Sequence, residues 1–188
     1  MEDISLHILD IAENSVRADA QRIEIILTLD RTNDLLRVDV KDDGKGMDAD
    51  TLARVRDPFF TTKKKRTGLG IPLLAQAAEQ TGGYLTIDSA QGNGTRLAVV
   101  FGASHVDRPA LGNMADTLMT LIAGHADLDL VYEERDNERV FRFDTREIKQ
   151  DLEGVPINTP PVLEAIRGML DQEMHLERED HRSLRGNP

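Results

Sequence analysis

Two polar side chains four residues apart, Asp10 and Asn14, occupy the first segment with helical periodicity. A spacing of four places both on one stripe of a helix, and His7 lies on the same stripe one turn earlier. The amide oxygen of Asn14 is a suitable ligand for Mg²⁺, and a carboxylate one turn away could orient or deprotonate a water molecule. Taken alone, this spacing also fits a solvated helix face.

A second polar group is the loop Asp42-Asp43-Gly44-Lys45-Gly46-Met47, which follows an alternating apolar stretch. Two spaced glycines after a strand allow the backbone to approach a ligand closely, and the Asp42 carboxylate could accept a hydrogen bond from an exocyclic amine. An ordinary turn is the alternative. A calcium loop of the EF-hand type fits worse, because Lys41 occupies the third position counted from Asp39.

The third group is Thr61–Gly70 (TTKKKRTGLG), which contains four consecutive cations in an acidic protein. Glycines directly before a helix leave free N–H groups and the positive end of the helix dipole for phosphate. The alternative is a solvated basic loop. Neither a GxxxxGK[ST] nor a GxGxxG pattern occurs in the sequence. A fourth group, Gly92-Asn93-Gly94-Thr95, is by itself a hairpin turn.

The apolar periodicity predicts the elements that would position these groups. We expect five helices, one of them short, and six strands that form three hairpins. The expected helices are 4–18, 71–80, 115–123 and 161–174, with a short helix at 48–55 capped by Asp48. The expected strands are 22–29, 35–41, 84–89, 95–101, 129–133 and 140–144.

In order and spacing, these groups resemble the N, G1, F/G2 and G3 boxes of the GHKL ATPase superfamily, which comprises gyrase, Hsp90, histidine-kinase and mismatch-repair ATPases. The segments that carry the resemblance are DIAENSVRADA (10–20), DDGKGM (42–47), DPFFTTKKKRTGLGIPL (57–73) and TGGYLTIDSAQGNGTRLAVVF (81–101). The resemblance implies an α+β fold, a two-layer α/β sandwich of Bergerat type with a mixed, largely antiparallel sheet.

The resemblance also implies roles for individual residues. Asn14 would coordinate Mg²⁺ that bridges the phosphates of ATP, and Asp42 would accept the adenine amino hydrogen. Residues 57–70 would form a lid over the nucleotide. The other implied nucleotide contacts are Gly44, Gly46 and Met47 near the base, Thr62, Lys63, Gly68, Leu69 and Gly70 at the phosphates, and Thr95 on the base side of the pocket.

The sequence departs from the family at two points that bear on mechanism. Asp10 stands where the ATPase branches have a Glu general base, and its side chain is one methylene shorter, so we expect a direct contact to water to be lost or repositioned. The kinase branch carries its phosphoacceptor His in a preceding helix pair, whereas only six residues precede His7 here. We therefore expect no autophosphorylation by the usual route.

The charge of −11 is unevenly distributed over the 188 residues. Residues 1–102 carry 16 acidic and 13 basic side chains, and residues 103–188 carry 18 and 10. We expect an ATP-binding domain at 1–102, a small α-β-β-α extension at 103–175 and a loose tail at 176–188. The extension would dock a protein partner or a second copy of the chain, or else complete the fold.

The acidic composition argues against a nucleic-acid partner and against attachment to anionic membranes. No Cys and no long apolar run occur, and the first residues lack the pattern of a signal peptide, so we expect a cytoplasmic protein. Three functions remain open: a kinase module that transfers the γ-phosphoryl group of Mg-ATP to a partner protein, a slow ATPase that switches a partner interface, and a nucleotide sensor or anti-sigma-type regulator with little turnover.

Overall fold

The computed structural model describes residues 3–55, 70–137 and 139–176. Its helices are α1 (Ile4–Arg17), α2 (Ala49–Arg54), α3 (Gly70–Gln80), α4 (Met114–Gly124), α5 (Thr145–Asp151) and α6 (Pro160–Glu173). Its strands are β1 (Arg22–Asp30), β2 (Leu35–Asp42), β3 (Tyr84–Ser89), β4 (Thr95–Gly102), β5 (Asp129–Asp136) and β6 (Arg139–Asp144).

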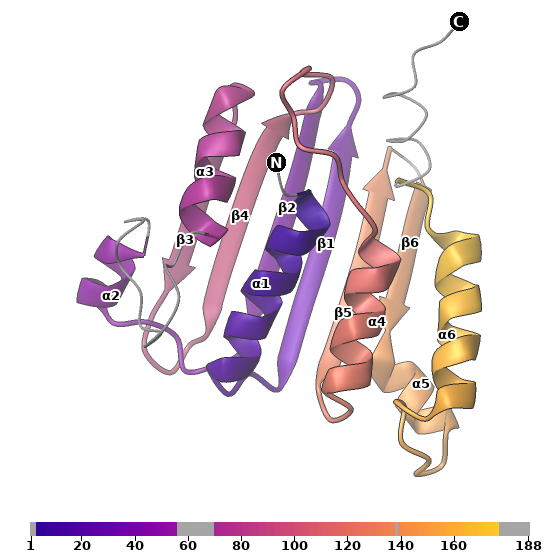
Figure 1. The fold of residues 1–188 in the computed structure, drawn as a ribbon. Helices are drawn as coiled ribbons and strands as arrows, with labels where there is room; N and C mark the ends of the chain where they lie inside the picture. Colours follow the sequence, from indigo (N-terminus) through magenta and orange to yellow (C-terminus); the bar gives the residue numbers. More distant parts are fainter. Residues whose placement is uncertain (1–2, 56–69, 138, 177–188) are drawn as a thin grey trace, which may run out of the picture.

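The six strands form one sheet in the order β3-β4-β2-β1-β5-β6. Only β1 and β5 run parallel, while the other neighbours are antiparallel, so the predicted mixed, largely antiparallel sheet is confirmed. The longer helices α1, α3, α4 and α6 lie on one face of this sheet (Figure 1). The two-layer α+β architecture expected from the sequence is therefore present.

Buried and more exposed side chains alternate along the strands, so the two faces of the sheet differ in character. Ile23, Ile25 and Leu27 of β1 are fully buried beneath the helices, as strand periodicity requires. The side chains on the other face of the central strands are largely charged. Asp39 there pairs with Arg37 at 2.5 Å and with Arg96 at 3.0 Å. The apolar core consequently lies between the sheet and the helices.

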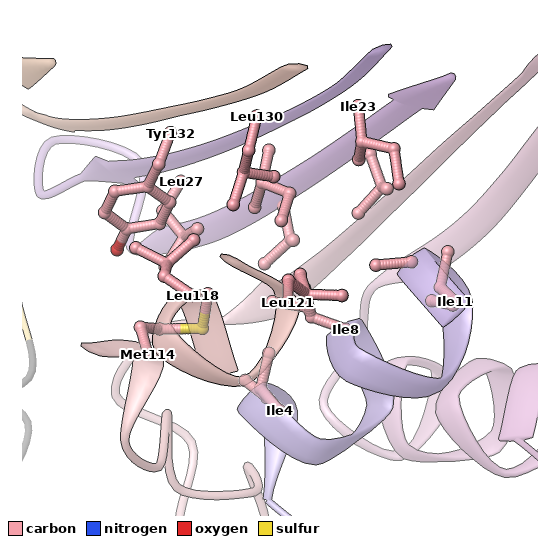
Figure 2. Packing of buried hydrophobic residues seen from close by; sticks show 14 of the residues in the cluster. Ile4, Ile8, Ile11, Ile23, Leu27, Met114, Leu118, Leu121, Leu130 and Tyr132 are labelled. Carbon is pink, nitrogen blue, oxygen red and sulfur yellow. The ribbon is translucent and has the colours of Figure 1, made fainter. Parts of the chain in front are cut away.

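The core is continuous from the first half of the chain into the extension. Figure 2 shows Ile4 and Ile8 of α1 together with Leu118 and Leu121 of α4, all packed towards β1 and β5. Strand β5 extends the sheet by pairing with β1 from Arg22↔Asp129 to Leu29↔Asp136. The extension thus contributes two strands and two core helices to the same layered structure.

The structure corrects two details of the sequence analysis. Helix α5 was not expected, and it begins directly after β6, with Asp144 as its N-cap. His7 is only 4% exposed, although its spacing placed it on the polar stripe of Asp10 and Asn14. The reason is that α1 is packed against α3 on one side and α4 on the other, so its buried surface is wider than its apolar stripe.

Candidate functional site

Asp42, the last residue of β2, is the buried centre of the candidate site. Its Oδ2 accepts a hydrogen bond of 2.6 Å from the Ser15 hydroxyl on α1. Its Oδ1 accepts hydrogen bonds from the backbone N–H groups of Gly44 at 2.9 Å and Thr95 at 3.1 Å. A carboxylate has about four lone-pair sites, so Asp42 can accept one more donor from a ligand. Three of the predicted site residues are thereby brought together with Ser15.

Gly44 and Gly46 allow the loop after β2 to pass very close to the end of α1 and to the β3–β4 turn. A Cβ on Gly44 would lie 2.7 Å from the carbonyl oxygen of Ala18. Gly46 has φ +64°, and a Cβ there would lie 2.0 Å from the carbonyl oxygen of Ala90. The loop also donates from Lys45 N–H to Ala18 at 2.8 Å. Any larger residue at Gly44 or Gly46 would push the loop away from α1 or from the β3–β4 turn.

Ser89 joins this loop to the start of β4. Its hydroxyl accepts a hydrogen bond of 2.9 Å from Met47 N–H, donates to the Gly94 carbonyl at 2.8 Å, and lies 3.1 Å from Thr95 Oγ1. The link from Thr95 to Asp42 runs through the backbone, while the Thr95 hydroxyl contacts Ser89. The predicted residues Met47 and Thr95 therefore border the same polar cluster.

Sequence reasoning did not select Ser15 and Ser89. Ser15 occupies the small-residue position directly after Asn14, and its hydroxyl could have been recognised as a partner for a buried carboxylate only with the fold in hand. Ser89 ends β3, and only the register of β3 with β4, which places Ser89 opposite Thr95, brings it to the site.

Asn14 lies in the last turn of α1, beside this cluster in sequence. Its Oδ1 accepts a hydrogen bond of 2.9 Å from Arg17 Nη1. Within the described ranges, no three His, Cys, Asp or Glu side chains group together in a way that could hold a metal ion. A lone amide oxygen fits a Mg²⁺ ion that takes its other ligands from phosphates and water, and does not fit a metal held by protein side chains alone.

Asp10 lies directly against the first residue of α3. A Cβ built on Gly70 would be 2.5 Å from Asp10 Oδ2, so only glycine leaves room for the carboxylate in this position. The N-terminal end of a helix carries partial positive charge, which favours a neighbouring anion. The predicted residues Asp10 and Gly70 are thus neighbours across the α1–α3 contact.

Four predicted phosphate contacts, together with most of the expected lid, lie outside the described residues: Thr62, Lys63, Gly68 and Leu69. The site that the structure describes consequently comprises the cluster around Asp42, the end of α1 and the start of α3.

Residues 2–105, more than half of the chain, match the model of the family described as histidine kinase-, DNA gyrase B- and HSP90-like ATPases. The chain belongs to this family, the GHKL superfamily, and its N-terminal part is an ATP-binding module of the histidine-kinase-like type. The match includes every segment from which the site above is built.

Individual relatives agree with this assignment. The sensor histidine kinase ZraS of Escherichia coli O157:H7 is 34% identical over 92 residues, 49% of this chain and 20% of that protein. Sporulation kinase C of Bacillus subtilis is 32% identical over 92 residues, 49% of this chain and 22% of that protein. The sensor kinase CckA of Brucella abortus is 41% identical over 68 residues, 35% of this chain and 7% of that protein. This chain therefore spans a quarter or less of these relatives.

Among solved structures, the N-terminal domain of a DNA repair protein has the same fold. The two superpose with a TM-score of 0.53 at 12% sequence identity, over 76% of this chain and 52% of the other. Within residues 3–55, 70–137 and 139–176, no helix is both long and apolar enough to cross a membrane.

Proposed function

We propose that this protein binds Mg-ATP at the cluster around Asp42 and transfers the γ-phosphoryl group to a partner protein. The observation that carries the proposal is the fixed Asp42 carboxylate, buried yet with unused acceptor capacity. The amino group of adenine is a donor of the right type for that acceptor. Guanine presents a carbonyl oxygen at the equivalent ring position, so a carboxylate there favours adenine over guanine.

The end of α1 would hold the phosphates and their metal ion. Asn14 would provide one oxygen ligand to Mg²⁺, through the Oδ1 lone pair that the hydrogen bond from Arg17 Nη1 leaves free. Mg²⁺, when bound, would neutralise charge that develops on the transferred phosphoryl group. The residues of this chain would contribute by holding the nucleotide in a fixed orientation.

The acceptor is proposed to lie on another protein, because the described histidines are poorly placed to receive a phosphoryl group. His7 and His175 are each 4% exposed. His125 is hydrogen-bonded to Glu13 at 2.9 Å, and His105 lies in the segment that follows β4. Transfer to a side chain of a partner that docks beside α1 and α3 requires no rearrangement of the buried His7 and His175 rings.

Hydrolysis of ATP is a second candidate, favoured by the position of Asp10. Its carboxylate lies at the start of α3, where the family places phosphates, and could orient an attacking water. This chemistry would make the protein a slow ATPase whose nucleotide state controls a partner. A sensor without turnover would use the same pocket but not Asp10.

The products separate these functions. The protein is incubated with γ-labelled ATP and Mg²⁺, with and without cell extract, and label is followed on protein and in free phosphate. Label on a second polypeptide supports transfer. Free phosphate that is lost in Asp10→Ala supports hydrolysis. Calorimetry without detectable ATP binding by the wild-type protein would contradict all three functions.

A further inference from the structure

Glu13 of α1 and His125 at the end of α4 form a polar contact between the ATP-binding module and the extension. Their Oε1 and Nε2 atoms are 2.9 Å apart, although the residues are 112 positions apart in sequence. A carboxylate only accepts, so the ring nitrogen donates. His125 is the C-cap of α4, and its backbone N–H donates to the Leu121 carbonyl at 2.9 Å. The helix end therefore fixes the place from which the ring reaches α1.

The contact continues to the proposed metal ligand. Arg17 Nη2 lies 3.8 Å from Glu13 Oε2, and Arg17 Nη1 donates to Asn14 Oδ1 at 2.9 Å. His125, Glu13, Arg17 and Asn14 thus form an unbroken chain of polar contacts. It begins on the extension and ends at the amide that would ligate Mg²⁺.

This chain of contacts adds little to the stability of the fold. The side chains of His125 and Glu13 are both 29% exposed, and a partly exposed polar contact contributes little to folding. The seam between the two helices is held instead by buried apolar residues, among them Ile8 and Leu118 (Figure 2). The polar chain can therefore orient side chains at the end of α1 without being needed for folding.

We propose that His125 is a positioning residue for the nucleotide site: through Glu13 and Arg17 it orders the Asn14 amide for the metal-bound phosphates. The extension then regulates nucleotide affinity, because any partner that displaces the end of α4 also releases Glu13. This inference rests on the proposed function, since it requires that Asn14 meets Mg-ATP.

The test compares nucleotide binding with and without Mg²⁺, measured by calorimetry on the full chain. His125→Ala should weaken ATP affinity in Mg²⁺ about two- to fivefold, the range expected for a partly exposed polar contact, and leave affinity in EDTA unchanged. His125→Gln, which keeps a side-chain N–H donor, should recover most of the loss. Glu13→Ala should match His125→Ala, and the double variant should be no weaker than either.

His105→Ala is the matched control. The His105 ring accepts a hydrogen bond from the Asp107 backbone N–H at 3.2 Å in the segment after β4, away from Asn14. It should leave affinity unchanged. Amide hydrogen exchange at residues 14–18 gives a second readout, and should be faster in His125→Ala but not in the His105→Ala control.

The outcomes distinguish this inference from the proposed function. Wild-type protein that binds ATP in Mg²⁺, together with a His125→Ala variant of equal affinity and exchange, overturns the role of His125 alone. An equal loss with and without Mg²⁺ also overturns it, because a general structural defect would act on both. Wild-type protein without Mg²⁺-dependent ATP binding overturns both.

Discussion

The Ser15 hydroxyl determines how the Asp42 carboxylate is oriented. Its single O–H hydrogen donates to the nearer acceptor, Asp42 Oδ2 at 2.6 Å, while the Ile11 carbonyl oxygen lies 3.2 Å from the same hydroxyl. The hydroxyl thus joins α1 to the end of β2 at the centre of the site. Hydrogen bonds to a carboxylate are stronger than neutral ones, and a buried one restricts its rotation. Asp42 could be selected from the sequence, but its partner could not, because a serine inside a helix has no pattern that marks it as buried.

Replacing Ser15 by Ala should therefore lower both stability and ATP affinity. The loss of one buried hydrogen bond to a charged group costs about 1.5–3 kcal/mol of unfolding free energy. Urea unfolding and calorimetry with ATP would measure the two effects. Ser104→Ala is the control, since Ser104 donates to Asp34 Oδ2 at 2.6 Å on the exposed surface. A Ser15→Ala variant with wild-type ATP affinity would show that the orientation of Asp42 does not matter for binding.

A substitution at Gly70 tests the contact between α1 and α3. Gly70→Ala would place a methyl group 2.5 Å from Asp10 Oδ2, so the carboxylate must rotate. If ATP is hydrolysed, the rate of phosphate release should fall, and Asp10→Ala should make the Gly70→Ala effect disappear. Gly168→Ala on α6 is the control, because a Cβ there meets nothing within 4 Å. Phosphate release at the wild-type rate in Gly70→Ala would argue against a role for the Asp10 position.

At the scale of elements, helix α5 shows what a sequence pattern misses. It has seven residues and only one fully buried side chain, Thr145, so it lacks the apolar repeat by which longer helices are recognised. Its start is defined instead by Asp144, which accepts from Arg146 N–H at 3.0 Å and pairs with the Arg142 and Arg146 guanidinium groups. Hydrogen bonds from the Arg146 side chain are the main reason that the pKa of Asp144 falls to about 2.

This lowered pKa predicts how α5 contributes to stability. A carboxyl group whose pKa is lower in the folded state stabilises the fold above its ordinary pKa, near 3.8, and loses that contribution as the pH falls towards 2. Asp144→Asn should reduce the unfolding free energy by about 1–2 kcal/mol at pH 6, with a smaller difference from wild type below pH 4. Urea unfolding between pH 6 and pH 2.5 measures this. A difference that is constant over this range would contradict the assignment.

Buried polar contacts also anchor the segment that follows α6. The Glu134 carboxylate on β5 is completely buried and accepts from the Tyr132 hydroxyl at 2.6 Å and from the backbone N–H groups of His175 at 3.0 Å and Leu176 at 3.2 Å. A buried carboxylate requires hydrogen-bond donors, and here the last described residues supply two of them. These contacts join that segment to the sheet. The segment after α6 is thus held against β5 by hydrogen bonds to this one buried carboxylate.

At the scale of the whole molecule, the extension and the first half of the chain share one sheet and one apolar core. Strand β5 lies beside β1, and the helix α4 covers β1 and β5 together with α1 (Figure 1). The hairpin of β5 and β6 was predictable from local alternation. Its pairing with β1 was not, because parallel register between segments about 100 residues apart leaves no local pattern.

Removing the extension should therefore destabilise the ATP-binding module. A chain ending at Gly102 would leave β1 as an unpaired edge and expose the α1 side chains Ile4 and Ile8, which favours aggregation. A chain ending at Leu176 retains every described contact and is the control. Solubility, circular dichroism and ANS fluorescence would measure the difference. A soluble, cooperatively folding 1–102 fragment would show that the extension is dispensable for folding.

The ATP affinity of Asp42→Asn tests the central claim most directly. The asparagine carbonyl can still accept from Gly44 and Thr95, while the other position becomes a donor that cannot accept the adenine amino group. We predict that calorimetry in Mg²⁺ shows ATP binding weakened by about 1.5–3 kcal/mol, with the variant folded as judged by circular dichroism. A folded Asp42→Asn variant that binds ATP as tightly as wild type would contradict the assignment of Asp42 to adenine.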